Sequence, residues 1–379
     1  MNAAEYICKI LYHTFCTLII CGAVARGRQK TFSLKLGRME LYRRDEWSRG
    51  IGVMTILCFC LLEGIYSFIC GPYHVYLVDR GVFAARFIRG HYSRSSSVGL
   101  YYIQNILRQF TLNPDVLFFV VAFLFLLITM YAYNLSRDAT PKALLYMCMS
   151  QYLLYGCYQL KQAMAAAFAA LAIVGFLEKR KTALIMGTVC SIAFHESGLV
   201  LIPLFVIMYG SKSRMIQILG YTVLVSFVFF FSQSSRVAVR VVTDLIPSMK
   251  AQLAGYLDES GGIETGGSIL AALKGFPIYY ITLRGFLERR KLKRAVPDTD
   301  RYLLLCMFAS IATASTVWME WMWRFSELVY LPVFIFASRM REELPEEKRN
   351  IYDLVICGSL GFFTYRKLLI SYFTYGGLV

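Results

Sequence analysis

Long apolar runs separated by short polar turns recur along almost the whole of this 379-residue chain. About 20 apolar residues in a helix cross the ~30 Å hydrocarbon core of a bilayer, and a helix satisfies its own backbone polar groups there. The pattern therefore predicts an all-α fold, a polytopic transmembrane helical bundle of about 12 spans with short re-entrant or interfacial helices. The predicted spans are 5–24, 51–70, 116–134, 143–158, 163–177, 182–194, 199–209, 215–232, 267–283, 302–318, 325–338 and 351–370.

Composition agrees with this interpretation. Hydrophobic residues make up 57% of the chain and charged residues only 17%, as in membrane proteins with many spans. No polar segment between the runs is long enough to fold alone, so we expect a single integral-membrane domain over residues 1–379.

The formal net charge of +16 does not indicate a nucleic-acid-binding protein, because most of the basic residues lie in alternate loops. Such an alternation is the positive-inside pattern, and it predicts cytoplasmic loops at these positions and both chain ends outside. The two largest expected basic cytoplasmic loops are 25–50 and 284–301. The shorter basic segments are 137–142, 179–181, 212–214 and 339–349.

The sequence carries no motif for a cofactor or a metal. Its 11 cysteines contain no CxxC pair, and most lie in apolar runs, where cysteine acts as a small hydrophobe. Walker loop, GxGxxG, HExxH and GxSxG motifs are absent as well. We therefore expect no cofactor and no metal site.

Two expected outer loops are long. The loop 71–115 carries Tyr76, Asp79 and Arg80, and its tail at 97–103 is typical of a short amphipathic helix along the interface. Asp79 and Arg80 can equally form a simple ion pair on a solvated loop. The loop 233–266 is rich in Gly and Ser and predicts a mobile lid or a plain linker.

Two polar clusters bracket one short apolar hairpin. Lys161 and Gln162 open an Ala-rich helix, a basic turn at 178–181 reverses the chain, and the return helix ends at His195 and Glu196. Lys161 and His195 are therefore expected at the same end of the hairpin, in a protein-lined cavity, and ionisable groups at such depth suggest a functional site. Two alternatives stay open: Lys161 pairs with Glu196, or His195 is an ordinary interfacial histidine.

A third polar cluster joins two predicted spans at 318–325. Its tryptophans, which include Trp321 and Trp323, suit an aromatic belt at the membrane interface, with Arg324 reaching the headgroups. Alternatively, the flat rings stack on sugars while Glu320 and Arg324 hold hydroxyls or phosphate. Lys161 and Arg324 together suit a pyrophosphate, which offers many acceptor oxygens.

In their order and spacing these clusters resemble the EpsG-type exopolysaccharide polymerases, relatives of the Wzy polymerases. The resemblance covers roughly residues 73–336. Lys161 replaces the arginine usual in the family, and 97–99 replaces an expected Glu-Pro-Gly-like turn. The segments that carry it are Tyr76 with Asp79-Arg80 and Phe83, Lys161-Gln162-Ala163-Met164, Phe194-His195-Glu196-Ser197-Gly198-Leu199 with Ile202-Pro203, and Arg324-Phe325-Ser326 with Leu331-Pro332.

The resemblance implies a membrane glycosyltransferase in the bacterial inner membrane. It would polymerise undecaprenyl-pyrophosphate-linked oligosaccharide repeat units into exopolysaccharide, capsule or O-antigen at the outer leaflet. Partners would be the lipid-linked glycan, and a flippase and a chain-length regulator of the same pathway. The implied roles are base or orienting group for His195, Glu196 and Asp79, pyrophosphate binding for Lys161, Gln162, Arg324 and Arg80, and sugar binding for Trp321, Trp323, Glu320 and Tyr76.

Two other functions stay open at this point. A flippase or transporter for a lipid-linked glycan also has many spans and a basic cavity, although transporters often show two similar halves, which this sequence lacks. A membrane O-acyltransferase that modifies the same polymer also places a histidine and arginines in spans.

Overall fold

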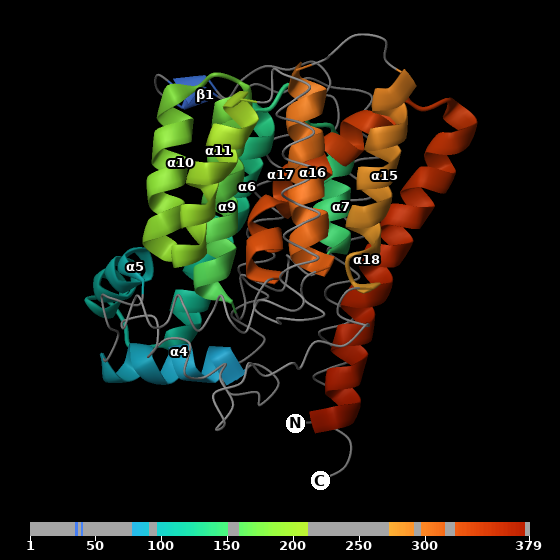
Figure 1. Ribbon diagram of the computed structural model, residues 1–379. Coiled ribbons are helices and arrows are strands. Elements are labelled where there is room, and N and C mark those ends of the chain that lie inside the picture. The colour runs from blue at the N-terminus through green and yellow to red at the C-terminus, as the bar shows by residue number, and fades with distance from the viewer. Residues whose placement is uncertain are drawn as a thin grey trace, which may run out of the picture. The chain divides into compact units, whose positions relative to one another are not determined.

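The structure is a computed structural model, and it describes residues 35–36, 39–40, 78–90, 97–150, 159–210, 273–291, 297–314 and 323–375 (Figure 1). These residues are helical apart from an antiparallel pair of two-residue strands, β1 (Lys35–Leu36) and β2 (Met39–Glu40). The chain divides into two compact units, Met1–Ile202 with Leu331–Val379, and Pro203–Tyr330. The helical expectation is thus confirmed for the described part of the chain.

Helices α6 (Pro114–Leu135), α9 (Leu160–Leu177) and α10 (Lys181–Phe194) form the core of the first unit (Figure 1). Asn113 starts α6 by accepting a hydrogen bond from the Asp115 backbone N–H, 3.0 Å away, and Pro114 occupies the first helical position. Among the described residues, α6 and α9 are long and apolar enough to cross a membrane, and α10 is a shorter apolar helix. A count of 12 spans stays a prediction.

Small residues allow α9 and α10 to approach closely as an antiparallel hairpin. A Cβ atom added to Gly187 would lie 2.5 Å from the backbone nitrogen of Ala172, and one added to Gly175 would lie 2.5 Å from that of Leu184. The alanines of α9 are buried almost throughout its length. Close backbone approach through Gly and Ala is how helices pack in lipid, where burial of apolar surface drives little association.

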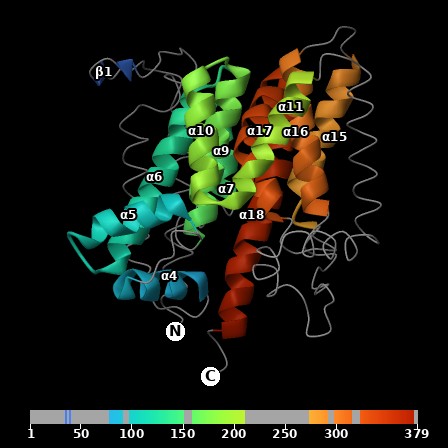
Figure 2. The same cartoon turned by 60° about the vertical axis from the view of Figure 1, so that its left-hand side comes forward.

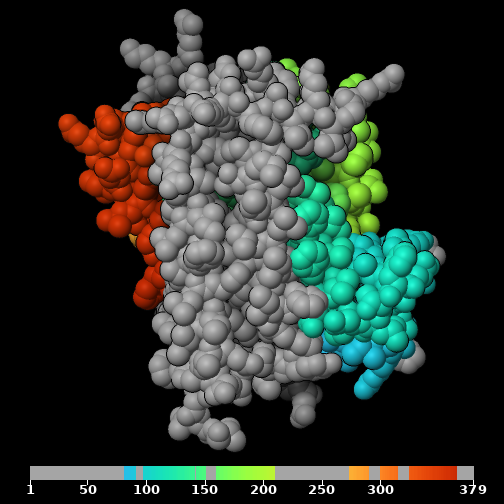
Figure 3. Space-filling view, turned by 180° about the vertical axis from the view of Figure 1, so that it is seen from behind, coloured from blue at the N-terminus to red at the C-terminus, as the bar shows by residue number. Residues whose placement is uncertain are grey.

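Two short helices cross the end of this bundle. Helix α4 (Val78–Arg89) and helix α5 (Val98–Arg108) lie at the lower ends of α6 and α10 in two views (Figures 1 and 2). Their side chains project at the surface beside α6 (Figure 3). The amphipathic helix predicted at 97–103 is present, and it begins at Ser97, whose Oγ accepts a hydrogen bond from the Leu100 backbone N–H. Helix α4 was not expected within the loop 71–115.

The first unit also contains α7 (Pro141–Met149), the C-terminal part of α17 (Trp323–Glu343) and α18 (Glu346–Tyr375). The Tyr133 hydroxyl of α6 donates a hydrogen bond to the backbone oxygen of Leu331, 3.0 Å away. The next residue, Pro332, has no backbone N–H and so donates no hydrogen bond within α17.

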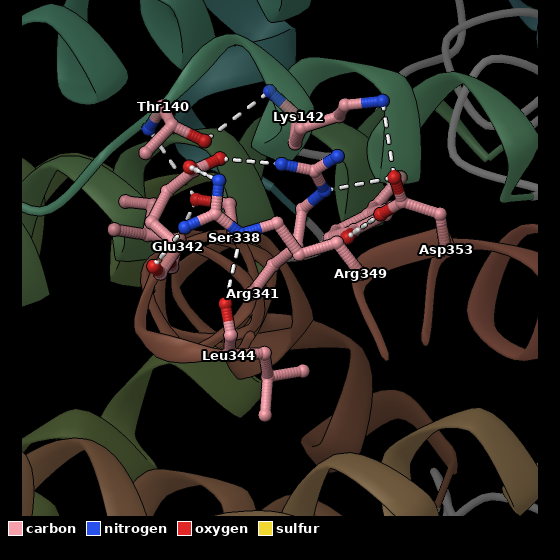
Figure 4. A network of polar contacts seen from close by, with 10 residues as sticks. Thr140, Lys142, Ser338, Arg341, Glu342, Leu344, Arg349 and Asp353 are labelled. Carbon is pink, nitrogen blue, oxygen red and sulfur yellow. Dashed lines mark hydrogen bonds and ion pairs between the residues drawn. The ribbon is translucent and has the colours of Figure 1, made fainter. Parts of the chain in front are cut away.

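A network of ion pairs and hydrogen bonds lies where α7 and α18 begin and α17 ends (Figure 4). Asp353 of α18 accepts hydrogen bonds from Arg341 Nε at 2.8 Å and the Tyr146 hydroxyl at 2.6 Å, and Lys142 Nζ lies 3.1 Å away. Burial lowers the pKa of Arg341, but its bonds to Asp353 and Glu342 more than compensate, so the net pKa is raised and the guanidinium stays charged. We call this part of the unit the ion-pair end.

Further ion pairs bring three of the predicted basic segments together at the ion-pair end. Arg137 pairs with Glu178 at 3.0 Å, which joins segment 137–142 to the turn of the α9–α10 hairpin. Arg339 pairs with Asp138 at 3.2 Å, which joins the same segment to 339–349. Three segments that the charge pattern places on one side of the membrane thus lie at one end of the unit.

The second unit contains α11 (Leu201–Gly210) from Pro203 onward, and α15 (Phe276–Lys291) packed against α16 (Pro297–Ala314). The segment 284–301, expected to be a loop, is helical up to Lys291 and again from Pro297. The charges do not end the helices because they pair: Arg284 with Glu288 at 3.6 Å one turn on, and Arg289 with the buried Asp300.

The bounds of the predicted spans agree with those of the helices to different degrees. Helices α9, α10 and α17 begin and end within five residues of the predicted bounds, whereas α15 begins nine residues later than its predicted span at 267–283. The predicted spans 5–24, 51–70 and 215–232 and the loop 233–266 lie outside the described residues.

Candidate functional site

The α9–α10 hairpin brings Lys161 and His195 to the same end, as predicted. The Ser191 hydroxyl of α10 donates a hydrogen bond to the backbone oxygen of Ala165 in α9, 2.9 Å away. Lys161 precedes Ala165 by four residues and His195 follows Ser191 by four, so each lies one helical turn beyond this bond. This end is opposite to the turn at 178–181, and therefore opposite to the ion-pair end.

His195 has a fixed local geometry. It has an extended backbone, with φ −153° and ψ 133°, and it separates α10 from the short 3-10 helix η3 (Glu196–Val200). Its Nδ1 accepts a hydrogen bond from the Ser197 backbone N–H at 3.1 Å, and its backbone oxygen accepts one from the Gly198 N–H at 2.9 Å. We call residues 195–198 the His195 turn.

This hydrogen bond selects the tautomer of the imidazole. Because Nδ1 uses its lone pair to accept the Ser197 N–H, the neutral ring carries its proton on Nε2. Nε2 is then a hydrogen-bond donor, not a proton acceptor. The geometry thus suits His195 as a donor to a phosphate or sugar oxygen better than as a general base.

The residues beside His195 differ in exposure. Glu196 is exposed at the start of η3, Lys161 is half-buried in the first turn of α9, and Gln162 is buried next to it. The first turn of a helix presents backbone N–H groups without helical partners, which favour an anion. The alternative pairing of Lys161 with Glu196 stays a prediction.

The remaining expected site residues are not brought together by the described structure. Asp79 and Arg80 lie in the first turn of α4, in the first unit, and not on an irregular loop. Trp323 begins α17 and Arg324 follows it in the second unit, so the expected meeting of Arg324 with Lys161 stays a prediction. Tyr76, Glu320 and Trp321 lie outside the described residues.

Two buried polar residues, one in α5 and one in the His195 turn, were not predicted from the sequence. Gln104 of α5 and Ser197 of the turn are buried. A glutamine in an amphipathic helix and a serine beside a histidine give no signal by themselves. Within the described part of the chain, no three His, Cys, Asp or Glu side chains lie close enough to hold a metal ion.

Comparison with known proteins identifies the family. A sequence model of the EpsG family matches residues 56–376, which is most of the chain, and the chain therefore belongs to the EpsG family. No curated protein and no solved structure matches it. Membership implies a role in polysaccharide polymerisation and agrees with a membrane protein that has apolar helices such as α6 and α9.

Proposed function

We propose that this EpsG-family chain is a membrane glycosyltransferase that polymerises undecaprenyl-pyrophosphate-linked oligosaccharide repeats at the outer leaflet of the bacterial inner membrane. The observation that carries the proposal is the α9–α10 hairpin, whose one end holds Lys161 and His195 while the other belongs to the ion-pair end. Family membership supplies the class of reaction.

The orientation in the membrane follows from the ion-pair end. Three basic segments meet there, and the positive-inside rule assigns such an end to the cytoplasm. The His195 turn then faces the outer leaflet. Helix α10 has 14 residues and is thus about 21 Å long, against ~30 Å of hydrocarbon. This length supports a position of the turn below the outer surface, at the depth proposed for the lipid-linked substrate.

The reaction in this proposal transfers the growing glycan to the next repeat unit. A hydroxyl oxygen of the acceptor sugar bonds to the anomeric carbon of the donor, while the bond from that carbon to the pyrophosphate oxygen breaks. The leaving pyrophosphate takes the electron pair, and the hydroxyl proton passes to a base. Lys161 and the first-turn N–H groups of α9 stabilise the departing charge, with Gln162 beside them.

His195 donates its Nε2 proton in a hydrogen bond to a pyrophosphate oxygen, as its tautomer favours. The base is then a carboxylate, Glu196 on the turn or Asp79 at the start of α4. Arg80 and Arg324 are further cations for the pyrophosphate. Tyr76, Glu320, Trp321 and Trp323 are proposed to hold the sugars, and a flippase and a chain-length regulator are the proposed pathway partners.

Two substitutions at His195 separate its role as a hydrogen-bond donor through Nε2 from its bond to the Ser197 N–H. Asparagine can accept the Ser197 N–H in place of Nδ1 but has no group at the Nε2 position, whereas glutamine carries an N–H donor near that position. In a strain that depends on this protein, we expect H195N to collapse the polysaccharide ladder to single repeats. H195Q should retain polymer of reduced length, and K161A should lose it.

The outcomes are measured by gel analysis of surface polysaccharide at matched protein levels. Normal polymer from both K161A and H195N would overturn the proposed site. Loss of polymer in H195Q equal to that in H195N would contradict the donor role and favour a base. Repeat units stranded on the inner leaflet after deletion of the gene would indicate a flippase, and unchanged chain length with altered acetylation would indicate an O-acyltransferase.

A further inference from the structure

Gln104 and Ser197 bury polar atoms for which the described residues supply no hydrogen-bond partner. Gln104 is 2% exposed, and within the part of the chain that the structure describes neither its Oε1 nor its Nε2 is bonded. The same holds for Oγ of Ser197, which is also buried. Native proteins pair the great majority of their buried polar groups, and in a bilayer no bulk water replaces a missing partner. These atoms therefore call for a ligand.

Helix α5 turns Gln104 inward while it turns apolar side chains outward. Tyr102 is 49% exposed and Ile106 56%, and Val98 continues the same stripe. For an interfacial helix this arrangement is stable, because the outward stripe contacts lipid. The inward face then carries Leu100 and Gln104, one turn apart, toward the rest of the unit.

Helix α5 is fixed against the end of α10 that carries the His195 turn. A Cβ atom at Gly99 would lie 2.8 Å from the ring of Phe194, so the α5 backbone touches the residue that precedes His195. At its other end, Arg108 Nη1 donates to the backbone oxygen of Phe87 in α4 at 2.8 Å. Gln104 lies between these two anchors, five residues from Gly99, which is about 7.5 Å along the helix axis.

The chemistry of the two side chains selects a neutral ligand. A carboxamide offers two donors and an acceptor, and a hydroxyl offers one donor and two acceptors. Neither carries charge, so they match sugar hydroxyl or acylamino groups and contribute little to holding a pyrophosphate. We propose that Gln104 and Ser197 bind a sugar of the lipid-linked glycan beside the His195 turn. This subsite rests on the proposed function and adds residues that recognise the sugar and not its carrier.

The test compares two ligands on the purified full-length protein in detergent. One is the lipid-linked repeat extracted from a strain that lacks this protein, and the other is undecaprenyl pyrophosphate without sugar. The variants are Gln104→Leu and Ser197→Ala, and Gln109→Leu is the control, because Gln109 is exposed at the end of the same helix. Binding is measured as ligand-dependent thermal stabilisation.

We expect Gln104→Leu to weaken binding of the lipid-linked repeat ~3–10-fold, because one or two neutral hydrogen bonds are lost. Binding of undecaprenyl pyrophosphate without sugar should stay unchanged. Without ligand, the variant should melt at the same temperature as the wild type or higher, because leucine removes unbonded polar atoms at similar volume. Ser197→Ala should behave alike, and Gln109→Leu should change neither affinity.

Three results would overturn the subsite. Unchanged affinity of both variants for the repeat would do so while leaving the proposed function intact. A melting temperature lowered by several degrees in ligand-free Gln104→Leu would show that Gln104 has a protein partner and a structural role. Absence of binding of either ligand to the wild type would remove the proposed function and the subsite together.

Discussion

Asp353 is the residue on which the ion-pair end depends most. Its carboxylate accepts hydrogen bonds from Tyr146 and Arg341 and pairs with Lys142, so it links α7, α17 and α18 (Figure 4). Asp353→Ala would leave two cations close together without the anion between them. Arg341 would keep its bond to Glu342 at 2.8 Å. The substitution is therefore expected to weaken the packing of all three helices.

The magnitude follows from the contacts. A hydrogen bond to a charged group contributes about 1.5–3 kcal/mol net, and bonds that share one acceptor do not add. The Asp353 side chain is 16% exposed, so water recovers part of the loss. We expect Asp353→Ala to lower the free energy of unfolding by about 2–4 kcal/mol, compared with 3–5 kcal/mol for fully buried pairs. For a unit of this size the melting temperature should fall by roughly 5–10 °C.

Cysteine alkylation gives a local assay for this loss. Cys148 of α7 is buried and becomes reactive when these helices separate, whereas Cys357 of α18, one turn after Asp353, is half-buried and reacts partly in the folded state. Purified protein is heated with a maleimide and the modified cysteines are identified by mass spectrometry. Glu343→Ala is the matched control, because Glu343 is 54% exposed and its one ion pair among the described residues is with Arg339, one turn away. Glu343→Ala should lower the free energy of unfolding by only about 0.3–0.5 kcal/mol.

Two results would contradict this prediction: a melting temperature of Asp353→Ala within one or two degrees of the wild type, or a melting temperature of Glu343→Ala lowered as much as that of Asp353→Ala. In the first case the network has no net stabilising effect, since its desolvation cost would equal its Coulombic gain. In the second case the effect would come from net charge, not from the geometry in Figure 4.

Two further predictions concern the hairpin and the second unit. Gly187→Ala places a Cβ 2.5 Å from the backbone nitrogen of Ala172 and should cost about 1–3 kcal/mol by overpacking. In Gly358→Ala the added Cβ meets no atom of the described residues within 4 Å, so this variant should be neutral or stabilising. Equal melting temperatures for the two glycine variants would contradict this. Asp300→Ala removes the buried partner of Arg289 and should lower the free energy of unfolding by about 2–3 kcal/mol. The loss is measured as the temperature at which the buried Cys306 is alkylated, and an unchanged temperature would refute the prediction.

The hairpin could be predicted from the sequence because its signals are local. The basic turn at 178–181 is short, the flanking runs are apolar, and antiparallel neighbours follow from a tight connection. The position of Lys161 and His195 at one end is then a matter of counting residues. The bounds of α15 could not be predicted in this way, because Arg284 and Arg289 sit in a helix where ion pairs replace solvation.

Two features could not be predicted from the sequence: which side of α5 packs against protein, and which tautomer His195 adopts. The period of an amphipathic helix is visible in the sequence, but it does not say which side meets protein, and at a membrane interface the apolar side can face outward. Gln104 was therefore not recognised as a buried residue. The tautomer depends on one backbone hydrogen bond from Ser197, which no residue pattern encodes.

The two ends of the first unit differ in how their polar groups are satisfied, and this difference has a consequence for mutation. At the ion-pair end, Asp353 and its partners form hydrogen bonds to one another, so substitution there removes stability. At the other end, Gln104 and Ser197 hold buried polar atoms that have no hydrogen-bond partner among the described residues, so apolar substitution there removes a cost in stability. Stabilising substitutions that lose activity are the usual sign of a binding site. If both ends instead respond alike, with loss of stability, then Gln104 and Ser197 have structural roles and the proposed sugar subsite is wrong, whereas the roles of Lys161 and His195 are decided by K161A and H195N.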